Sequence, residues 1–319
     1  MTGFLIRRAG QAVIVVLGVT AVIFILEHLI PGSLARAILG GHASPAEIAS
    51  FNRANGLDHP VAEQYLIFLG HLARGDLGYS YRYNQSVDSL VIHQLPNDLL
   101  VVGCGLVLAL AIAVPLGIGQ AVHRSRAVDH AATSAVFALY SMPSYWLGLL
   151  LAGLVISLHA QRVLPPEVPS QAGSIGGLLA DPRALILPVL TLTLVNIALF
   201  SRYMRAAAIE TLAEDYVQVA RAKGLPARLV LSRHVVRNSL ISVTTLVGLS
   251  FPAILTSGLV VEYVFNVPGL ALTYYTAAVN SDYPVELGIT VLVGVVTVLG
   301  NLLADIAYAV LDPRVRYGS

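Results

Sequence analysis

The stretch LLVVGCGLVLALAIAVPLGIGQAV, residues Leu99–Val122, contains no Asp, Glu, Lys, Arg or His in 24 consecutive positions. Leu, Ile and Val occupy 13 of these positions. At roughly −0.3 to −0.6 kcal/mol for each such residue, they contribute about −4 to −8 kcal/mol to membrane insertion, which exceeds the cost of one central charge. About 20 residues cross the hydrocarbon core of a bilayer. This stretch therefore predicts a membrane-spanning helix.

Five further, strongly apolar runs of at least 18 residues also lack charged residues and histidine. Each is long enough to be a candidate for a spanning helix. We therefore predict an all-α integral membrane protein with six transmembrane helices. The five further runs are Ala9–Leu26, Ala131–Leu158, Ala184–Ser201, Asn238–Val261 and Leu287–Ala304.

The composition of the 319-residue chain supports a membrane protein. It is 56% hydrophobic and only 12% charged, whereas soluble domains are about 45–50% apolar and about 25% charged. High hydrophobicity also excludes a disordered chain, and a net charge of +1 argues against nucleic-acid binding. Because Cys104 is the single cysteine, no intrachain disulfide or CxxC metal site can form.

The basic residues predict the orientation. With the N-terminus inside, 13 of the 19 Lys and Arg residues fall in cytoplasmic segments, as the positive-inside rule requires. Both termini are therefore expected to be cytoplasmic. A cleaved signal peptide is the alternative for the first run, but its apolar core exceeds the usual 7–15 residues. The predicted order is an N-terminal transmembrane helix (1–30), an extracytoplasmic segment (31–98), a five-helix core (99–310) that contains a cytoplasmic loop (202–237), and a cytoplasmic tail (311–319).

The extracytoplasmic segment carries helix signals of its own. Ser44-Pro45-Ala46-Glu47 is typical of a helix N-terminus. Apolar residues then recur at helical spacing from Val61 to Leu72, and Arg74-Gly75-Asp76-Leu77-Gly78 ends the pattern. The segment is either a docking surface for an external partner or a lid over the helix bundle.

The cytoplasmic loop predicts two helices joined by a turn. Acidic residues precede Tyr216, and Arg221 and Lys223 follow it, a charge order that favours a helix. Gly224 suits the position after a helix C-terminus, and Pro226 suits the start of the next helix. A short helix held between two membrane helices can transmit force from a cytoplasmic partner. A solvated loop is the alternative; a DNA-binding helix-turn-helix is disfavoured because both ends are tethered to membrane helices.

Residues 215–225, DYVQVARAKGL, and residues 233–241, RHVVRNSLI, resemble the cytoplasmic EAA loop of ABC-importer permeases. The resemblance is closest to the B-type permeases of the dipeptide, oligopeptide and nickel branch. The chain departs from the general pattern at Gln218 and Val219, where Glu and Ala are usual, at Ser242, and after Pro96. Other agreeing stretches are Arg7-Arg8, residues 74–78 with Ser80, FNVPGL (265–270), Asp305 with Tyr308-Ala309, and LDPRVRY (311–317).

The resemblance implies a type I ABC-importer permease fold in the bacterial inner membrane. In such importers this subunit pairs with a second permease as a heterodimer, contacts two ATP-binding subunits and receives peptide from an external substrate-binding protein. Lys223, the only lysine, is followed by Gly, so no G-x-x-x-x-G-K-[ST] phosphate loop exists, and ATP and Mg are expected on the partner ATPases. The residues expected to contact an ATPase are Gln218, Ala220, Arg221, Lys223, Gly224 and Leu225.

Positions that weaken membrane helices are the candidates for the translocation pathway, because proline frees backbone carbonyls that a water-lined cavity can satisfy. Close helix packing explains them equally well. The candidates are Tyr145, beside Pro143, and Ser250, Thr256 and Ser257, around Pro252.

No enzyme or metal motif, such as G-x-S-x-G or H-E-x-x-H, is present, so we expect no catalytic, cofactor or metal site in this chain. The leading hypothesis is a peptide importer permease. The alternatives are a permease for nickel, glutathione or another small solute, a secondary transporter, and a membrane-embedded enzyme. A secondary transporter should show an inverted repeat, and the first and last three apolar runs show no such similarity.

Overall fold

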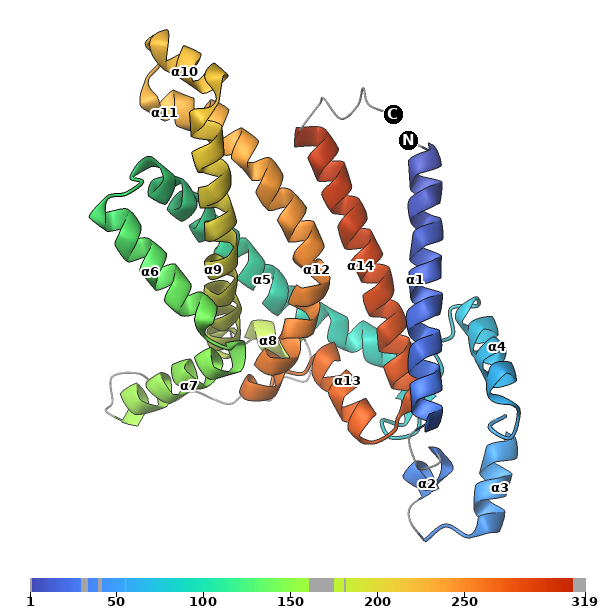
Figure 1. Ribbon diagram of the computed structural model, residues 1–319. Coiled ribbons are helices and arrows are strands. Elements are labelled where there is room, and N and C mark those ends of the chain that lie inside the picture. The colour runs from blue at the N-terminus through green and yellow to red at the C-terminus, as the bar shows by residue number, and fades with distance from the viewer. Residues whose placement is uncertain are drawn as a thin grey trace. The chain divides into compact units, whose positions relative to one another are not determined.

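The computed structural model describes residues 2–29, 34–39, 42–54, 56–160, 175–180 and 182–311 (Figure 1). It divides into two compact units, and the helices α5 (Val87–Val122) and α14 (Tyr283–Leu311) pass from one unit to the other. Unit 1 comprises Met1–Asn97 and Pro268–Val298, and unit 2 comprises Asp98–Val267 and Leu299–Ser319.

Three helices in the described ranges are long and apolar enough to cross a membrane: Val87–Val122, Arg183–Ala213 and Tyr283–Gly300. A bent helix pair adds a fourth span if its two halves are counted as one. The prediction of a mainly helical membrane protein is thus confirmed, although the described residues also include a two-stranded hairpin. The number of six spans and the cytoplasmic termini stay predictions.

The bent pair corresponds to the predicted run Ala131–Leu158. It forms two helices, α6 (Ala127–Ser141) and α7 (Ser144–Ala160), and the described part of this pair is bent by 103°. Met142 between them has extended backbone angles (φ −84°, ψ 125°), because a residue before proline avoids the helical region. The Met142-Pro143 pair therefore ends α6, and α7 begins after it in a different direction.

The described part of unit 1 contains four short helices, a hairpin, one whole long helix and parts of two others. Its apolar core joins the start of α5 (Val87, Leu90) to Leu270 and Ile289. The Ser80 hydroxyl donates a hydrogen bond of 2.5 Å to the Asp282 carboxylate and fastens the hairpin to the residue before α14. The elements that lie wholly within unit 1 are α1 (Thr2–Leu29), α2 (Leu34–Leu39), α3 (Pro45–Ala54), α4 (Val61–Leu72), β1 (Tyr79–Ser80), β2 (Gln85–Ser86) and α13 (Leu270–Val279).

The helix α5 begins twelve residues before the predicted Leu99. Its first turn contains Asp88, which lies in the favourable field of a helix N-terminus. The polar residues Asn97 and Asp98, which suggested a boundary, lie inside the helix and are buried. The Asn97 Nδ2 atom donates a hydrogen bond of 2.9 Å to the Pro268 carbonyl within unit 1, whereas its buried Oδ1 atom has no partner among the described residues.

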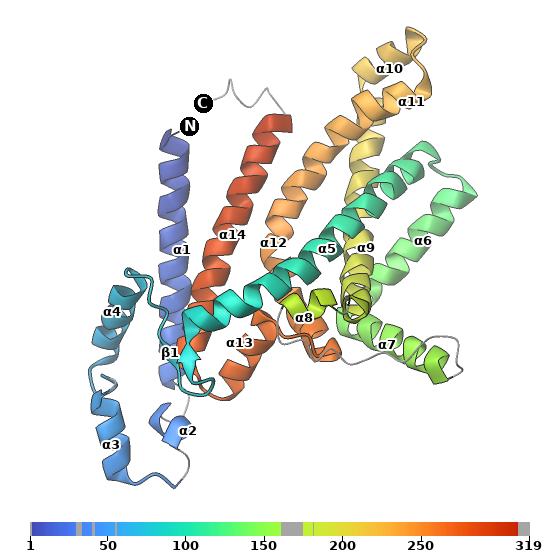
Figure 2. The same cartoon turned by 180° about the vertical axis from the view of Figure 1, so that it is seen from behind.

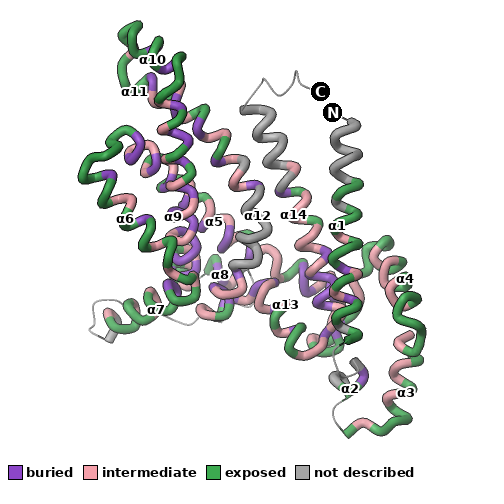
Figure 3. Tube along the Cα trace, in the orientation of Figure 1, coloured by how far each residue is buried: buried purple, intermediate pink, exposed green. Residues whose placement is uncertain are grey.

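Unit 2 is built around α9 (Arg183–Ala213), which packs against α6, α7 and α12 (Arg237–Phe265). Figure 3 shows the burial of α9 along most of its length. Phe200 and Met204 of α9 are fully buried at the centre of this core. A short helix, α8 (Ile175–Ala180), contributes Leu178 to the same core.

Small residues on α5 allow α9 to approach closely (Figure 2). A Cβ atom at Gly117 would lie 2.7 Å from the Met204 Cβ atom and 2.8 Å from the Ser201 carbonyl oxygen, closer than packed atoms can be. Small residues at four-residue spacing are typical of tightly packed membrane helices. The buried series on α5 is Gly105, Ala109, Ala113, Gly117 and Ala121.

Candidate functional site

The segment between α9 and α12, residues 214–236, is called the EAA segment below. It contains α10 (Asp215–Ala222), α11 (Ala227–Val230) and a π-helix, η1 (Leu231–Val236), which leads directly into α12. α10 and α11 lie together at one end of α9 (Figure 1). The predicted helix, turn and helix are therefore confirmed. Residues 202–213, which were assigned from the sequence to the cytoplasmic loop, continue α9 as a helix.

The turn after α10 is a complete Schellman motif. The Gly224 amide donates to the Arg221 carbonyl (2.9 Å), and the Leu225 amide donates to the Ala220 carbonyl (3.3 Å). Gly224 has a φ of +77°, a backbone conformation that costs least for glycine. The sequence prediction that Gly224 ends α10 is confirmed.

One face of α10 is buried in an apolar cluster. Val217 and Ala220, three residues apart, point into this cluster, since both are buried there. They pack with Ala208 of α9, Val230 of α11 and Val235 of η1. Leu225 of the turn packs against the same cluster. The short helix is therefore held to three neighbouring elements.

Two side-chain hydrogen bonds also fix the orientation of α10 relative to α9 and α12. The Gln218 amide donates to the Leu212 carbonyl at the end of α9 (3.0 Å). The Asn238 amide of α12 donates to the Tyr216 hydroxyl of α10 (3.0 Å). Gln218 replaces the usual Glu of the EAA pattern, and only the amide can donate this bond, since an ionised carboxylate is an acceptor.

The rest of α10 and its turn is exposed, as Figure 3 shows, and carries both acidic (Asp215) and basic side chains. Arg221 and Lys223 are exposed there, and Val219 retains 51% of its accessible surface. Basic side chains beside an exposed apolar residue suit a partner surface that is acidic at its rim and apolar at its centre. Of the six predicted contact residues, Ala220 and Leu225 face the apolar cluster, whereas Gln218, Arg221, Lys223 and Gly224 are exposed.

The predicted pathway residues are not brought together by the described contacts. Tyr145 lies in the first turn of α7 and is exposed. Ser250, Thr256 and Ser257 belong to α12, but their side chains lie outside the described part of the structure.

A partly buried ion pair in unit 2 was not predicted from the sequence; the Asp129 side chain is 3% exposed and the Arg205 side chain 29%. Asp129 of α6 and Arg205 of α9 form two parallel hydrogen bonds, 2.9 Å from Nε and 2.8 Å from Nη2. The sequence placed Arg205 in a cytoplasmic loop, where a solvated charge was expected. A carboxylate near the start of an apolar run, 76 positions away, does not reveal this pairing.

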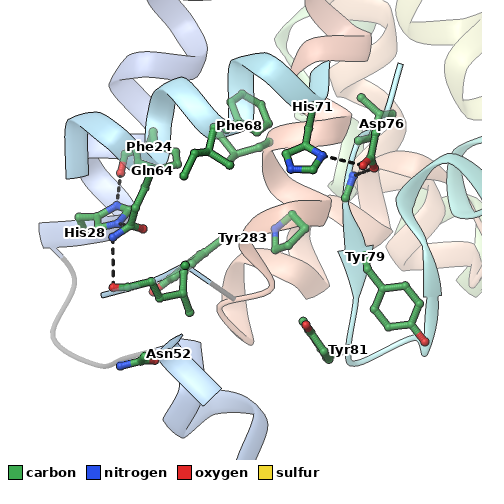
Figure 4. A pocket seen from close by; sticks show the side chains of 17 residues that line it. Phe24, His28, Asn52, Gln64, Phe68, His71, Asp76, Tyr79, Tyr81 and Tyr283 are labelled. Atoms are coloured by element: carbon green, nitrogen blue, oxygen red, sulfur yellow. Dashed lines mark hydrogen bonds and ion pairs between the residues drawn. The ribbon is translucent and has the colours of Figure 1, made fainter. Parts of the chain in front are cut away.

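Unit 1 contains a pocket of about 510 Å³. Figure 4 shows the His71 and Asp76 side chains facing each other in its wall, with 2.8 Å between Nδ1 and Oδ2. The Gly78 amide and His71 hold the pKa of Asp76 below its usual range. The lining is mainly aromatic and apolar: Phe24, Leu57, Ile67, Phe68, Leu77, Tyr79, Tyr81, Tyr283, Pro284 and Leu287, with His28, Asn52, Gly56, Gln64, His71, Asp76 and Gly78. Across the described residues, no three His, Cys, Asp or Glu side chains are grouped to hold a metal ion.

Family models match both parts of the chain. The model described as "Binding-protein-dependent transport system inner membrane component" matches residues 113–317, and its N-terminal counterpart matches residues 1–102. The chain belongs to this family. The predicted family resemblance and inner-membrane location are thus confirmed for this transport component.

The chain aligns with curated relatives over almost its whole length. The chain is 34% identical over 318 residues to the oligopeptide transport system permease protein AppB of Bacillus subtilis, and the alignment covers 99% of this chain and 100% of the relative. It is 31% identical over 338 residues to the dipeptide transport system permease protein DppB of Escherichia coli K12, covering 99% of both. A putative peptide permease protein of Brucella suis is 36% identical over 306 residues, covering 94% of both.

Proposed function

We propose that this transport component is a permease subunit of an ATP-driven importer of di- and oligopeptides. The observation that carries the proposal is the EAA segment, a short helix that is buried on one face and that exposes Arg221 and, in the following turn, Lys223. The names of the full-length relatives support peptides as the substrate class. The chain itself would bind no nucleotide, since it has no phosphate loop.

In the proposed mechanism, two ATPase subunits bind ATP and Mg, and one of them receives the exposed face of α10. Closure of the ATPases displaces α10. Because Val217 and Ala220 are packed against α9 and η1, the displacement is passed to α9 and α12 as a rigid-body movement. A second permease completes the pathway, and an external binding protein delivers the peptide.

The proposed topology has six spans with both termini in the cytoplasm. The distribution of 13 of 19 basic residues supports it, as do the lengths of α1 (28 residues) and α12 (29 residues), each sufficient to cross a bilayer. Tyr145, Ser250, Thr256 and Ser257 remain the proposed pathway residues. Reporter fusions at each terminus test the orientation, and an extracytoplasmic signal from either would contradict it.

Reconstitution tests the function. A tagged chain is purified from its native membrane, reconstituted with the proteins that accompany it, and supplied with a labelled dipeptide, binding protein and ATP. We expect two ATPase subunits in the complex and uptake that requires ATP hydrolysis. Purification of the chain alone, with uptake that needs no nucleotide, would indicate a secondary transporter instead.

A further inference from the structure

One carboxylate in unit 2 collects hydrogen bonds from three parts of the chain. Asp129 is 2% exposed and accepts both bonds of the Arg205 fork. It also accepts bonds from the Ser125 amide (3.0 Å), in the turn before α6, and from the Thr133 hydroxyl (3.2 Å). A bidentate Arg–carboxylate pair fixes the relative orientation of its two helices as well as their distance.

The network extends from α6 to α5 and along α9. The Gln120 amide at the end of α5 donates to the Thr133 hydroxyl (3.3 Å). One turn before Arg205, the Arg202 guanidinium lies over the rings of Phe137 (4.9 Å) and Tyr140 (4.5 Å) on α6, within the range of a cation–π contact. Two arginines of α9 therefore contact α6 from its first turn to the residues just before Pro143.

The same end of α9 carries α10. Ala208, one turn after Arg205, is buried in the apolar cluster with Val217 of α10. The Thr211 hydroxyl accepts a hydrogen bond from Ser239 of α12 (3.2 Å). Between these contacts α9 is an uninterrupted helix, so a displacement of α10 reaches Arg202 and Arg205 without an intervening hinge.

We infer that Arg202, Arg205 and Asp129 form a clasp that makes α6 move with α9 when α10 is displaced. They are positioning residues: they carry the movement to α6 and its bend at Pro143, and they touch neither peptide nor nucleotide. The inference rests on the proposed function. The Asp129–Arg205 pair mainly fixes the relative orientation of α6 and α9. It adds little stability, because a buried ion pair is often no more stabilising than apolar residues of similar size.

Coupling in the reconstituted complex tests the clasp. The variants are Arg205→Lys, which keeps the charge but loses the fork, Asp129→Asn, and the double variant Asp129→Asn with Arg205→Gln, which leaves no unpaired charge. The control is His130→Asn, an exposed neighbour on α6. We expect the peptide imported per ATP hydrolysed to fall by about fivefold or more, the lower end of typical coupling effects, in variants that still bind the ATPases. The control should keep the wild-type ratio.

A distance measurement separates coupling from simple structural support. In a Cys104→Ser background, spin labels at Ala131 of α6 and Ala206 of α9, both exposed, report the separation of the two helices. We expect that separation to be unchanged by ATP with vanadate in the otherwise wild-type complex, and to change in the double variant.

Several results would overturn the clasp. One is a wild-type α6–α9 separation that changes on nucleotide binding, and another is a variant with an unchanged transport ratio. Failure of all three variants to assemble, with a normal control, would show a purely structural role. By contrast, a wild-type complex without ATPase subunits would contradict the proposed function itself.

Discussion

The EAA segment and the N-terminal segment (residues 42–80) are both connections built from short helices, but they are held in opposite ways. α10 has only eight residues, yet Val217 and Ala220 are buried. α3 and α4 have ten and twelve residues, and neither contains a buried residue. Helices of such lengths are marginal alone and depend on tertiary packing.

Polar contacts, together with ring contacts of Tyr65 and Phe68 with Phe24 of α1, hold the N-terminal segment. Ser44 and Glu47 form a reciprocal capping box at the start of α3, as the sequence predicted. The Tyr65 hydroxyl of α4 donates to the Leu17 carbonyl of α1 (2.8 Å). Exposed hydrogen bonds can exchange with water, whereas an apolar cluster cannot be separated without exposing its surface. The EAA segment is thus suited to transmit force, and the N-terminal segment to adjust locally.

The largest expected effect comes from a charge placed in the apolar cluster of the EAA segment, which should damage this segment but not the N-terminal segment. Val217→Asp places a carboxylate where no member of the cluster is basic, and an unpaired buried ion costs several kcal/mol. We expect α10 to detach, with loss of ATPase subunits from the purified complex and protease cleavage within residues 214–236. The matched variant Leu66→Asp in α4, at a side chain that is 66% exposed, should change neither result. Equal damage from both would refute the contrast.

Gly224→Val tests the turn without disturbing packing. No atom lies within 4 Å of a Cβ at this position, so the effect comes from the φ of +77° and amounts to about 1–3 kcal/mol. Transport-linked ATP hydrolysis should fall while membrane insertion is retained, and Gly224→Asn should be milder because Asn tolerates this conformation better. Unchanged coupling in both variants would remove the turn from the mechanism.

Gln218→Glu restores the general EAA pattern but should weaken this particular segment. The substitution removes the amide donor to the Leu212 carbonyl, a loss of about 0.5–1.5 kcal/mol. Faster hydrogen exchange at the junction of α9 and α10 is the expected measurement. Slower exchange would show that the carboxylate finds a better partner.

The smallest expected effect is a pH dependence of local stability in the residues that follow α4. The Gly78 amide and His71 lower the folded-state pKa of Asp76, so the stabilisation is fully present above the unfolded-state pKa, near 3.8, and disappears as the pH falls through the lowered value. Hydrogen exchange of residues 73–80 should therefore increase in acid, after correction for intrinsic exchange. Asp76→Asn should remove this pH dependence, and an acid response that persists in the variant would assign it to another group.

Local signals in the sequence predicted local structure well. The Ser44–Glu47 cap, the spacing in α4 and the Gly224 turn all depend on residues a few positions apart, and all three are present. The small residues at four-residue spacing from Gly105 to Ala121 on α5 also indicate close helix packing, which was not predicted from the sequence.

Features that depend on distant residues escaped prediction. The bend at Pro143 has a local cause, but a proline inside an apolar run permits either a kink or a break, and distant packing decides between them. Asp129 and Arg205 meet only because α6 and α9 pack side by side. The partner of a charge is not encoded in the spacing of residues, and neither is the end of a helix: the charge-free run ends at Ser201, whereas α9 extends to Ala213.

The exposed turn of the EAA segment has a practical consequence. Lys223 is the only lysine of the chain, and it is exposed. Amine-reactive reagents would therefore modify one side chain, besides any free terminal amine, while maleimides would modify only Cys104, an exposed residue of α5. The natural chain thus carries two chemically distinct labelling positions, and protection of Lys223 from acylation would report occupancy of the turn without any engineered residue.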